Sequence, residues 1–115
     1  MEYMLLIYHS EAEKLPQETQ QQLFQEYMTF TQDLTKSGKN KGGAPLEPIA
    51  TATTVRVRNG KTVVTDGPFA ETKEQLGGYY LVEAKDLDEA ISIAARIPGA
   101  KLGAVEVRPV MKINM

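Results

Sequence analysis

The chain has 115 residues but no cysteine, no tryptophan and a single histidine. Without cysteine it forms no disulfide, thiolate metal site or cysteine nucleophile. One histidine among scattered carboxylates is a weak metal-binding set, so we expect no metal and no cofactor. The chain also lacks phosphate and dinucleotide loops and a serine elbow. These absences leave His9 as the one side chain that ordinarily titrates near neutral pH.

Neither charge nor hydrophobic length indicates a nucleic acid or a membrane. The 13 basic and 15 acidic residues give a net charge of -2, which attracts neither nucleic acid nor anionic lipid. The apolar run at residues 3–8 is too short to span a bilayer, and no charged leader precedes a longer one. Hydrophobic residues make up 42% of the chain and charged residues 24%, as in ordinary globular proteins. We expect one cytoplasmic domain over residues 1–115.

Two apolar runs, residues 3–8 and 77–83, predict central strands because hydrophobic side chains occupy both of their alternating faces. Each is followed by a predicted helix. Pro16 favours the first turn of a helix that ends near Ser37. Asp86, three residues before Glu89, is an N-cap signal for a helix that runs to about residue 97. The expected buried stripes are Leu23, Tyr27, Phe30 and Leu34 in the first helix, and Leu87, Ala90, Ile91, Ala94 and Ala95 in the second.

A hairpin is predicted over residues 54–65, where Asn59-Gly60 separates two alternating runs. A type I′ turn needs positive φ at both central residues, and these two residue types tolerate it. Arg56 and Arg58 share one face of the hairpin, so we expect that face to be wet and the hairpin to lie at a sheet edge.

The remaining segments complete the predicted order of elements. Glycines and prolines interrupt residues 39–54, which predicts a loop with one short strand, and residues 105–108 alternate as a last strand. The order βα, hairpin, βα, β matches a split β-α-β arrangement, an α+β fold with two helices on one face of a mainly antiparallel sheet. Two helices cover one face only, whereas both central strands are apolar on both faces. A second copy packed sheet to sheet would cover the other face, so we predict a homodimer.

A stiff corner at residues 64–74 joins two strand-like runs. Asp66-Gly67 favours a turn, and Pro68 fixes its own φ and extends the residue before it. Such a corner is suited to hold a site. It presents Asp66, Phe69, Glu71, Thr72 and Lys73. The structural alternatives are that Asp66 caps its own turn, Phe69 fills the core, and the charged residues lie on a solvated face.

Residues 66–74, with the sequence Asp-Gly-Pro-Phe-Ala-Glu-Thr-Lys-Glu, resemble the DGPF branch of the YCII-related family. Matching segments at 3–8, 52–56, 77–80 and 105–109 extend the resemblance over nearly the whole chain. It implies a ferredoxin-like fold in a dimeric α+β barrel, a bacterial origin and a largely unassigned function. Genes of this branch are often found beside those for extracytoplasmic-function sigma factors, which hints at a regulatory role.

Some YCII relatives are thought to be enzymes that use a His and Asp pair, with the His on the first helix. Counting back from Gly38 puts Tyr27 at that position. A phenol has a reference pKa of about 10 and is a poor general base at pH 7. His9, at the end of the first strand, is a substitute partner for Asp66, with an exposed loop histidine as the structural alternative.

Two functions remain open. In the first, the dimer is a ligand-binding or accessory module with a cleft that takes a small polar or aromatic molecule. The walls of this cleft are Asp66, Phe69, Tyr27 and His9. In the second, it is a lyase-type or hydrolase-type enzyme with His9 as the base and Asp66 orienting it. Tyr27 and Tyr79 are candidates to meet in a cleft between helix and sheet, with ordinary hydrogen bonding of buried tyrosines as the structural alternative. The full set of candidate ligand-binding residues is Tyr27, Asp66, Phe69, Glu71, Lys73 and Tyr79.

Overall fold

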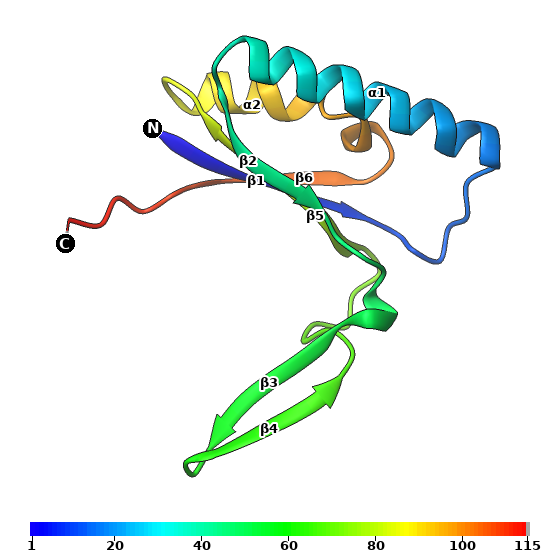
Figure 1. Cartoon of the computed structure of the whole chain (residues 1–115), viewed down its shortest axis with the longest axis vertical. Helices are drawn as coiled ribbons and strands as arrows, with labels where there is room; N and C mark the ends of the chain where they lie inside the picture. Colours follow the sequence, from blue (N-terminus) through cyan, green and yellow to red (C-terminus); the bar gives the residue numbers. More distant parts are fainter. Residues whose placement is uncertain (115) are drawn as a thin grey trace.

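The computed structural model describes residues 1–114 (Figure 1). Its helices are α1 (Gln17–Lys36) and α2 (Leu87–Arg96), with short 3-10 turns η1 (Ile49–Thr51) and η2 (Pro98–Lys101). Its strands are β1 (Glu2–His9), β2 (Asn40–Pro45), β3 (Thr53–Arg58), β4 (Lys61–Asp66), β5 (Gln75–Glu83) and β6 (Ala104–Pro109). Four strands form an antiparallel sheet in the order β2-β5-β1-β6, and β3 pairs with β4 in a separate two-stranded sheet. The predicted α+β class is confirmed.

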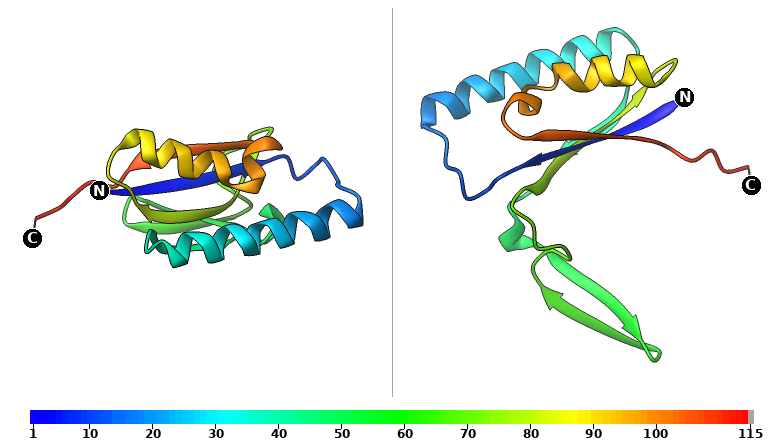
Figure 2. Two further views of the ribbon diagram at one scale, coloured as in Figure 1. Left: turned by 90° about the horizontal axis from the view of Figure 1, so that it is seen from above. Right: turned by 180° about the vertical axis from the view of Figure 1, so that it is seen from behind.

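The two predicted central strands, β1 and β5, lie at the centre of the sheet. Leu5 lies opposite Tyr80 on β5 and opposite Val107 on β6, and these residues share the face that the helices cover. Both helices lie over this one face, as the view from above shows (Figure 2). The buried core therefore forms between the helices and one face of the sheet.

The predicted helix ends are confirmed. The side chain of Asp86 accepts the N–H of Glu89 at 2.9 Å, and the Glu89 carboxylate accepts the N–H of Lys85 at 3.0 Å, so α2 begins with a reciprocal cap. That N–H, followed by the ammonium of Lys39 at 3.1 Å, holds the pKa of Glu89 below its usual value. The first helix stops at Lys36, before Gly38 at a φ of 76°.

The buried side of α2 differs from the prediction. Leu87 and Ile91 are 50% and 49% exposed, and Ala95 is exposed too. Ala90 and Ala94 are buried as predicted, but the helix also buries Ile93, and Ile97 follows as its buried C-cap residue. The buried side of the helix is therefore rotated by about one residue from the predicted side, so that Ile93 and Ile97, one turn apart, pack on the sheet. In α1 the predicted stripe is correct, with Phe30 and Leu34 buried, and Leu23 and Tyr27 half-buried.

The hairpin turn is confirmed but the predicted place of the hairpin is wrong. Asn59 and Gly60 have φ values of 53° and 73°, as a type I′ turn requires. The hairpin is not part of the main sheet, whose edge strands are β2 and β6. The position beside β5 belongs to β2. The short strand predicted within residues 39–54 is β2. Its Gly43 lies so close to β5 that a Cβ there would stand 2.6 Å from the carbonyl oxygen of Tyr79.

The hairpin, which we call the arm (residues 53–66), projects away from the sheet and helices, and residues 110–114 extend away from the sheet on another side (Figures 1 and 2). The radius of gyration is 16.2 Å, whereas a compact domain of this length has about 13 Å. No helix within residues 1–114 is long and apolar enough to cross a membrane. The shape is thus that of a two-layer body with an arm.

Candidate functional site

The Asp66 corner lies at the base of the arm. Asp66 ends β4 opposite Thr53, and it is exposed. Gly67 has a φ of 95°, and its N–H donates to the carbonyl oxygen of Ala52 at 2.8 Å. The hydroxyl of Thr54 donates to the Gly67 carbonyl oxygen, also at 2.8 Å. The predicted turn-capping role of Asp66 is wrong, because its carboxylate accepts no hydrogen bond within residues 1–114 and Thr54 holds the turn instead.

Residues of the corner after Gly67 form one wall of a hollow of about 470 Å³. Its lining combines apolar and charged side chains. The lining residues are Ile49, Pro68, Ala70, Glu71, Thr72, Lys73 and Gln75. Inside this wall, Gln75 donates to the carbonyl oxygen of Thr72 at 2.6 Å, and the Thr72 hydroxyl donates to that of Glu74. Of the candidate ligand-binding residues, Glu71 and Lys73 therefore lie in the hollow.

Phe69 is 74% exposed, so its predicted role as a core plug is wrong within this single chain. The guanidinium of Arg56 lies 4.9 Å from the centre of the Phe69 ring, a cation-π contact between the corner and β3. This contact turns the ring towards the arm, and neither Phe69 nor Asp66 lines the hollow.

His9 is the last residue of β1 and lies against Gly77 of β5. It is exposed, and a Cβ on Gly77 would stand 2.2 Å from its Cε1 atom, so the imidazole lies directly on the backbone of β5. The glycine sits where a β-bulge shifts the β1–β5 register. No hydrogen bond or ion pair joins His9 to Asp66 within residues 1–114. The lyase or hydrolase hypothesis needs this pair and gains no support from these contacts.

Glu11, which was not among the predicted site residues, links the body to the hollow. Its two carboxylate oxygens accept the N–H of Ile49 at 3.2 and 3.1 Å. Its own N–H donates to the side-chain oxygen of Gln75 at 2.9 Å. Ile49 and Gln75 both line the hollow, so the loop after β1 fixes one side of it. No local motif marks a loop glutamate for this long-range contact.

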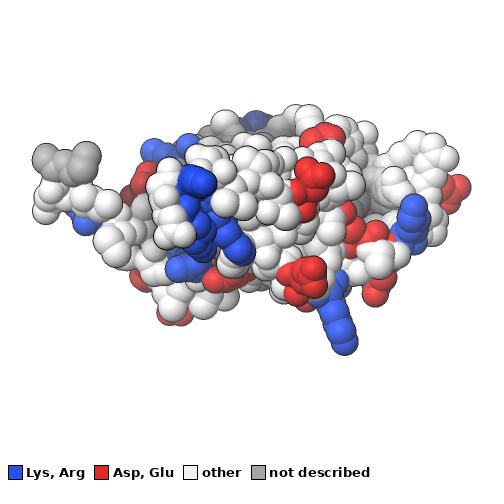
Figure 3. Space-filling model, turned by 90° about the horizontal axis from the view of Figure 1, so that it is seen from below, with Lys and Arg blue, Asp and Glu red and all other residues white. Residues whose placement is uncertain are grey.

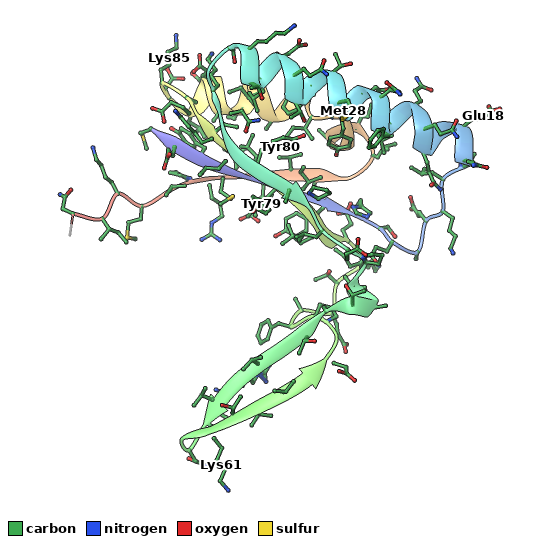
Figure 4. The ribbon with its side chains drawn as sticks, in the orientation of Figure 1. Glu18, Met28, Lys61, Tyr79, Tyr80 and Lys85 are labelled. Atoms are coloured by element: carbon green, nitrogen blue, oxygen red, sulfur yellow. The ribbon has the colours of Figure 1, made fainter. Side chains whose placement is uncertain are left out.

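The predicted meeting of Tyr27 and Tyr79 does not occur. Tyr27 is on the helix side, where its phenol oxygen accepts the N–H of Gly99 at 3.1 Å. Burial raises the pKa of Tyr27 above its usual value, and the Gly99 N–H offsets part of this rise. The tyrosine that faces the helices is Tyr80, whose hydroxyl lies 2.7 Å from that of Thr31. Tyr79 points to the opposite side of β5 (Figure 4).

Tyr79 belongs to the face of the sheet that no helix covers, which we call the open face. Met4 lies opposite Leu81, and Leu6 lies opposite Tyr79. The half-buried residues of the open face are Met4, Leu6, Tyr8, Tyr79 and Leu81. Charged residues on the same strands surround them, namely Glu2, Glu83, Glu106 and Arg108. At this rim the N-terminal ammonium pairs with Glu83 at 2.9 Å, and Arg108 pairs with Glu106 at 3.7 Å. The open face is therefore apolar at its centre and charged at its rim, where carboxylates outnumber cations by one.

The arm has the opposite charge. Its basic residues are Arg56, Arg58 and Lys61, and Lys61 stands at the tip (Figure 4). In the view from below, Lys and Arg side chains gather to the left of centre, and many of the carboxylates lie to their right (Figure 3). The arm and the body thus differ in electrostatic character.

The protein is an α+β protein with a two-layer body and one uncovered sheet face. A hollow lies beside its Asp-Gly-Pro-Phe corner. The model of the YCII-related domain matches residues 1–114, and the chain belongs to the YCII-related family. An uncharacterized protein of Rhizobium meliloti (strain 1021) is 37% identical over 113 residues, which cover 95% of this chain and 91% of that protein. The resemblance of the sequence to the YCII-related family is confirmed.

Proposed function

We propose that this YCII-related protein is a homodimeric module that binds a small polar molecule, in a ferredoxin-like fold that pairs into an α+β barrel. The observation that carries the binding role is the hollow of about 470 Å³ beside the Asp66 corner. Its volume falls in the range of ligand pockets, about 300–1,000 Å³. Glu71 and Lys73 provide opposite charges on one wall, and Pro68 and Ile49 provide apolar surface. This combination suits a small molecule with both a polar group and an apolar part.

The exposed surface supports the homodimer. The chain exposes 8607 Å², whereas a compact monomer of 12.7 kDa exposes about 6,200 Å². The difference, about 2,400 Å², is comparable to what one chain of an obligate homodimer buries, on the order of 1,000–2,500 Å². The open face is the broadest apolar surface of the sheet without a helix over it. A second copy packed sheet to sheet covers it in the proposed dimer.

A thermal-shift screen against a metabolite library tests the binding role. Wild type is compared with Lys73→Ala and Glu71→Gln in the hollow and Asp66→Ala beside it, with Lys41→Ala on β2 as the matched surface control. At a concentration 100-fold above Kd, a ligand stabilises the folded state by about 2.7 kcal/mol, enough for a shift of several degrees. We expect the hollow variants to lose most of the shift and the control to keep it. Hits with equal shifts on all variants would place the site elsewhere.

Light scattering tests the assembly. We expect a mass of twice 12.7 kDa at micromolar concentration. A mass of 12.7 kDa under these conditions would rule out the dimer while leaving the ligand screen interpretable.

A further inference from the structure

The arm carries an apolar surface that nothing in its own chain covers. Val55 lies opposite Val64, and Val57 lies opposite Thr62, so the three valines share one face. They are 60%, 62% and 62% exposed in the order Val55, Val57 and Val64. We call this surface the valine face of the arm. β-branched residues are the usual choice for a strand face that is packed against something.

A free two-stranded hairpin is marginally stable in water, because it has no core. At its base the arm is held by the bond from Gly67 to Ala52 and by the contact of Arg56 with Phe69. That contact lies on the opposite side of the hairpin from the valine face. We call this opposite side the basic face, because it carries Arg56, Arg58 and Lys61. Within residues 1–114 no helix or strand of the body packs extensively against the arm. The valine face therefore has the composition of an interface and lacks a partner within the chain.

The charges indicate which surface complements the arm. Residues 53–66 hold three cations and one carboxylate, a net charge of +2. The whole chain has a net charge of -2, so the other residues carry -4. The rim of the open face has three carboxylates and two cations, namely the Arg108 guanidinium and the N-terminal ammonium that bonds Glu83 at 2.9 Å, so its net charge is -1. A hairpin is narrow, and the long side chains of Arg58 and Lys61 reach around its edges to such a rim.

We propose that the arm of each chain clasps the second copy, with its valine face on the partner's open face and its basic side chains near the partner's rim carboxylates. The inference rests on the proposed homodimer and names the segment that crosses between the copies. A strand of six residues spans about 20 Å, enough to cross the four strands of a sheet at about 4.8 Å spacing. The arms then flank the sheet-to-sheet contact. Each arm covers the part of the partner's open face that the opposite sheet does not cover.

Photo-crosslinking tests the contact directly. A single introduced cysteine can be labelled selectively, because the chain has no cysteine of its own. A benzophenone maleimide is attached to Val57→Cys, and the labelled chain is mixed with an equal amount of wild type enriched in ¹⁵N. After irradiation, mass spectrometry identifies the joined peptides. We expect arm peptides of natural isotope composition, which carry the benzophenone, to be joined to ¹⁵N-enriched peptides of β1 and β5. Crosslinks within one chain only, or to the outer surface of α1, would overturn the inference. The same label at Gln32→Cys on α1 is the control and should join no second chain.

A matched pair of substitutions tests the energetics. Val57→Asp places a charge on the valine face, whereas Val63→Asp places it on the basic face of the same hairpin, where the side chain is 43% exposed. We expect Val57→Asp to raise the Kd of the dimer at least tenfold and Val63→Asp to change it less than threefold, with circular dichroism unchanged for both. If wild type is a dimer and both variants dimerise equally well, the arm inference fails and the dimer stands. If wild type is a monomer, the proposed dimer fails first.

Discussion

The two faces of the four-stranded sheet are similar in chemistry and differ in what covers them. On β1, Leu5 is fully buried beneath the helices, while its neighbour Leu6 is half-buried on the open face. On β5, Tyr80 packs edge-on against Phe30 with ring centres 5.2 Å apart, while Tyr79 is on the other side. Hydrophobic side chains therefore occupy both faces of these strands, but helices cover only one of them. The helix-covered face stabilises the single chain, and the open face is available for assembly.

The largest expected difference between the faces is in the stability of the single chain. Leu5→Ala should lower the free energy of unfolding by about 2–5 kcal/mol, because it leaves a cavity under the helices. Leu6→Ala is the matched variant, and at low protein concentration it should cost clearly less. Urea unfolding followed by circular dichroism measures both values. Equal losses at low concentration would mean that the open face is as well packed within one chain as the covered face.

The second difference is in assembly. Leu81→Arg places a charge on the open face and should shift the light-scattering mass from dimer to monomer, with a Kd raised at least tenfold, which is about 1.4 kcal/mol. Ile91→Arg is the control, since Ile91 is 49% exposed on the outer side of α2. It should leave the mass unchanged. Dissociation by the control variant alone would move the interface to the helices.

The two adjacent tyrosines give a smaller and sharper comparison. Tyr80→Phe removes the hydroxyl that lies 2.7 Å from the Thr31 hydroxyl and should cost about 1 kcal/mol of unfolding free energy. Tyr79→Phe should have little effect on the single chain, because no hydrogen bond joins its hydroxyl to another group of residues 1–114. Urea unfolding at low protein concentration measures both. A larger loss for Tyr79→Phe than for Tyr80→Phe would reverse the assignment of the faces.

The smallest expected effect is at alkaline pH. The pKa of Tyr27 is raised in the folded state, so above about pH 10 the unfolded chain loses the phenol proton first. The free energy of unfolding should therefore be highest below pH 10 and fall as pH rises through the folded pKa. Tyr27→Phe should reduce the slope of this fall in urea titrations between pH 9 and pH 11. An unchanged slope would show that Tyr27 titrates alike in both states.

Local chemistry was sufficient to predict much of this fold. The turn at Asn59-Gly60 and the cap at Asp86 depend on neighbouring residues alone, and both are correct. The position of the arm depends on which strand becomes the partner of β5, a choice made over long range. Gly43 allows β2 to approach β5 closely, so β2 takes that edge and the hairpin does not.

The candidate site was predictable in part. The corner after β4 was expected to hold a site, and Glu71 and Lys73 do line a hollow there. The alternation of β5 puts neighbouring tyrosines on opposite faces, but the sequence does not say which one meets the helices. That depends on the pairing of Leu5 with Tyr80. The contact of Glu11 with Ile49 lies between loops 38 residues apart and has no sequence signature.

The alternation of arginine and valine on β3 has a consequence for newly made chains. The single chain presents a hairpin with two unpaired strand edges and an exposed valine face. Such edges template edge-to-edge aggregation in crowded solutions. Arg56 and Arg58 on β3, with Lys61 at the start of β4, repel the same residues of another hairpin. If the proposed dimer forms, these charges oppose edge-to-edge pairing of arms before assembly.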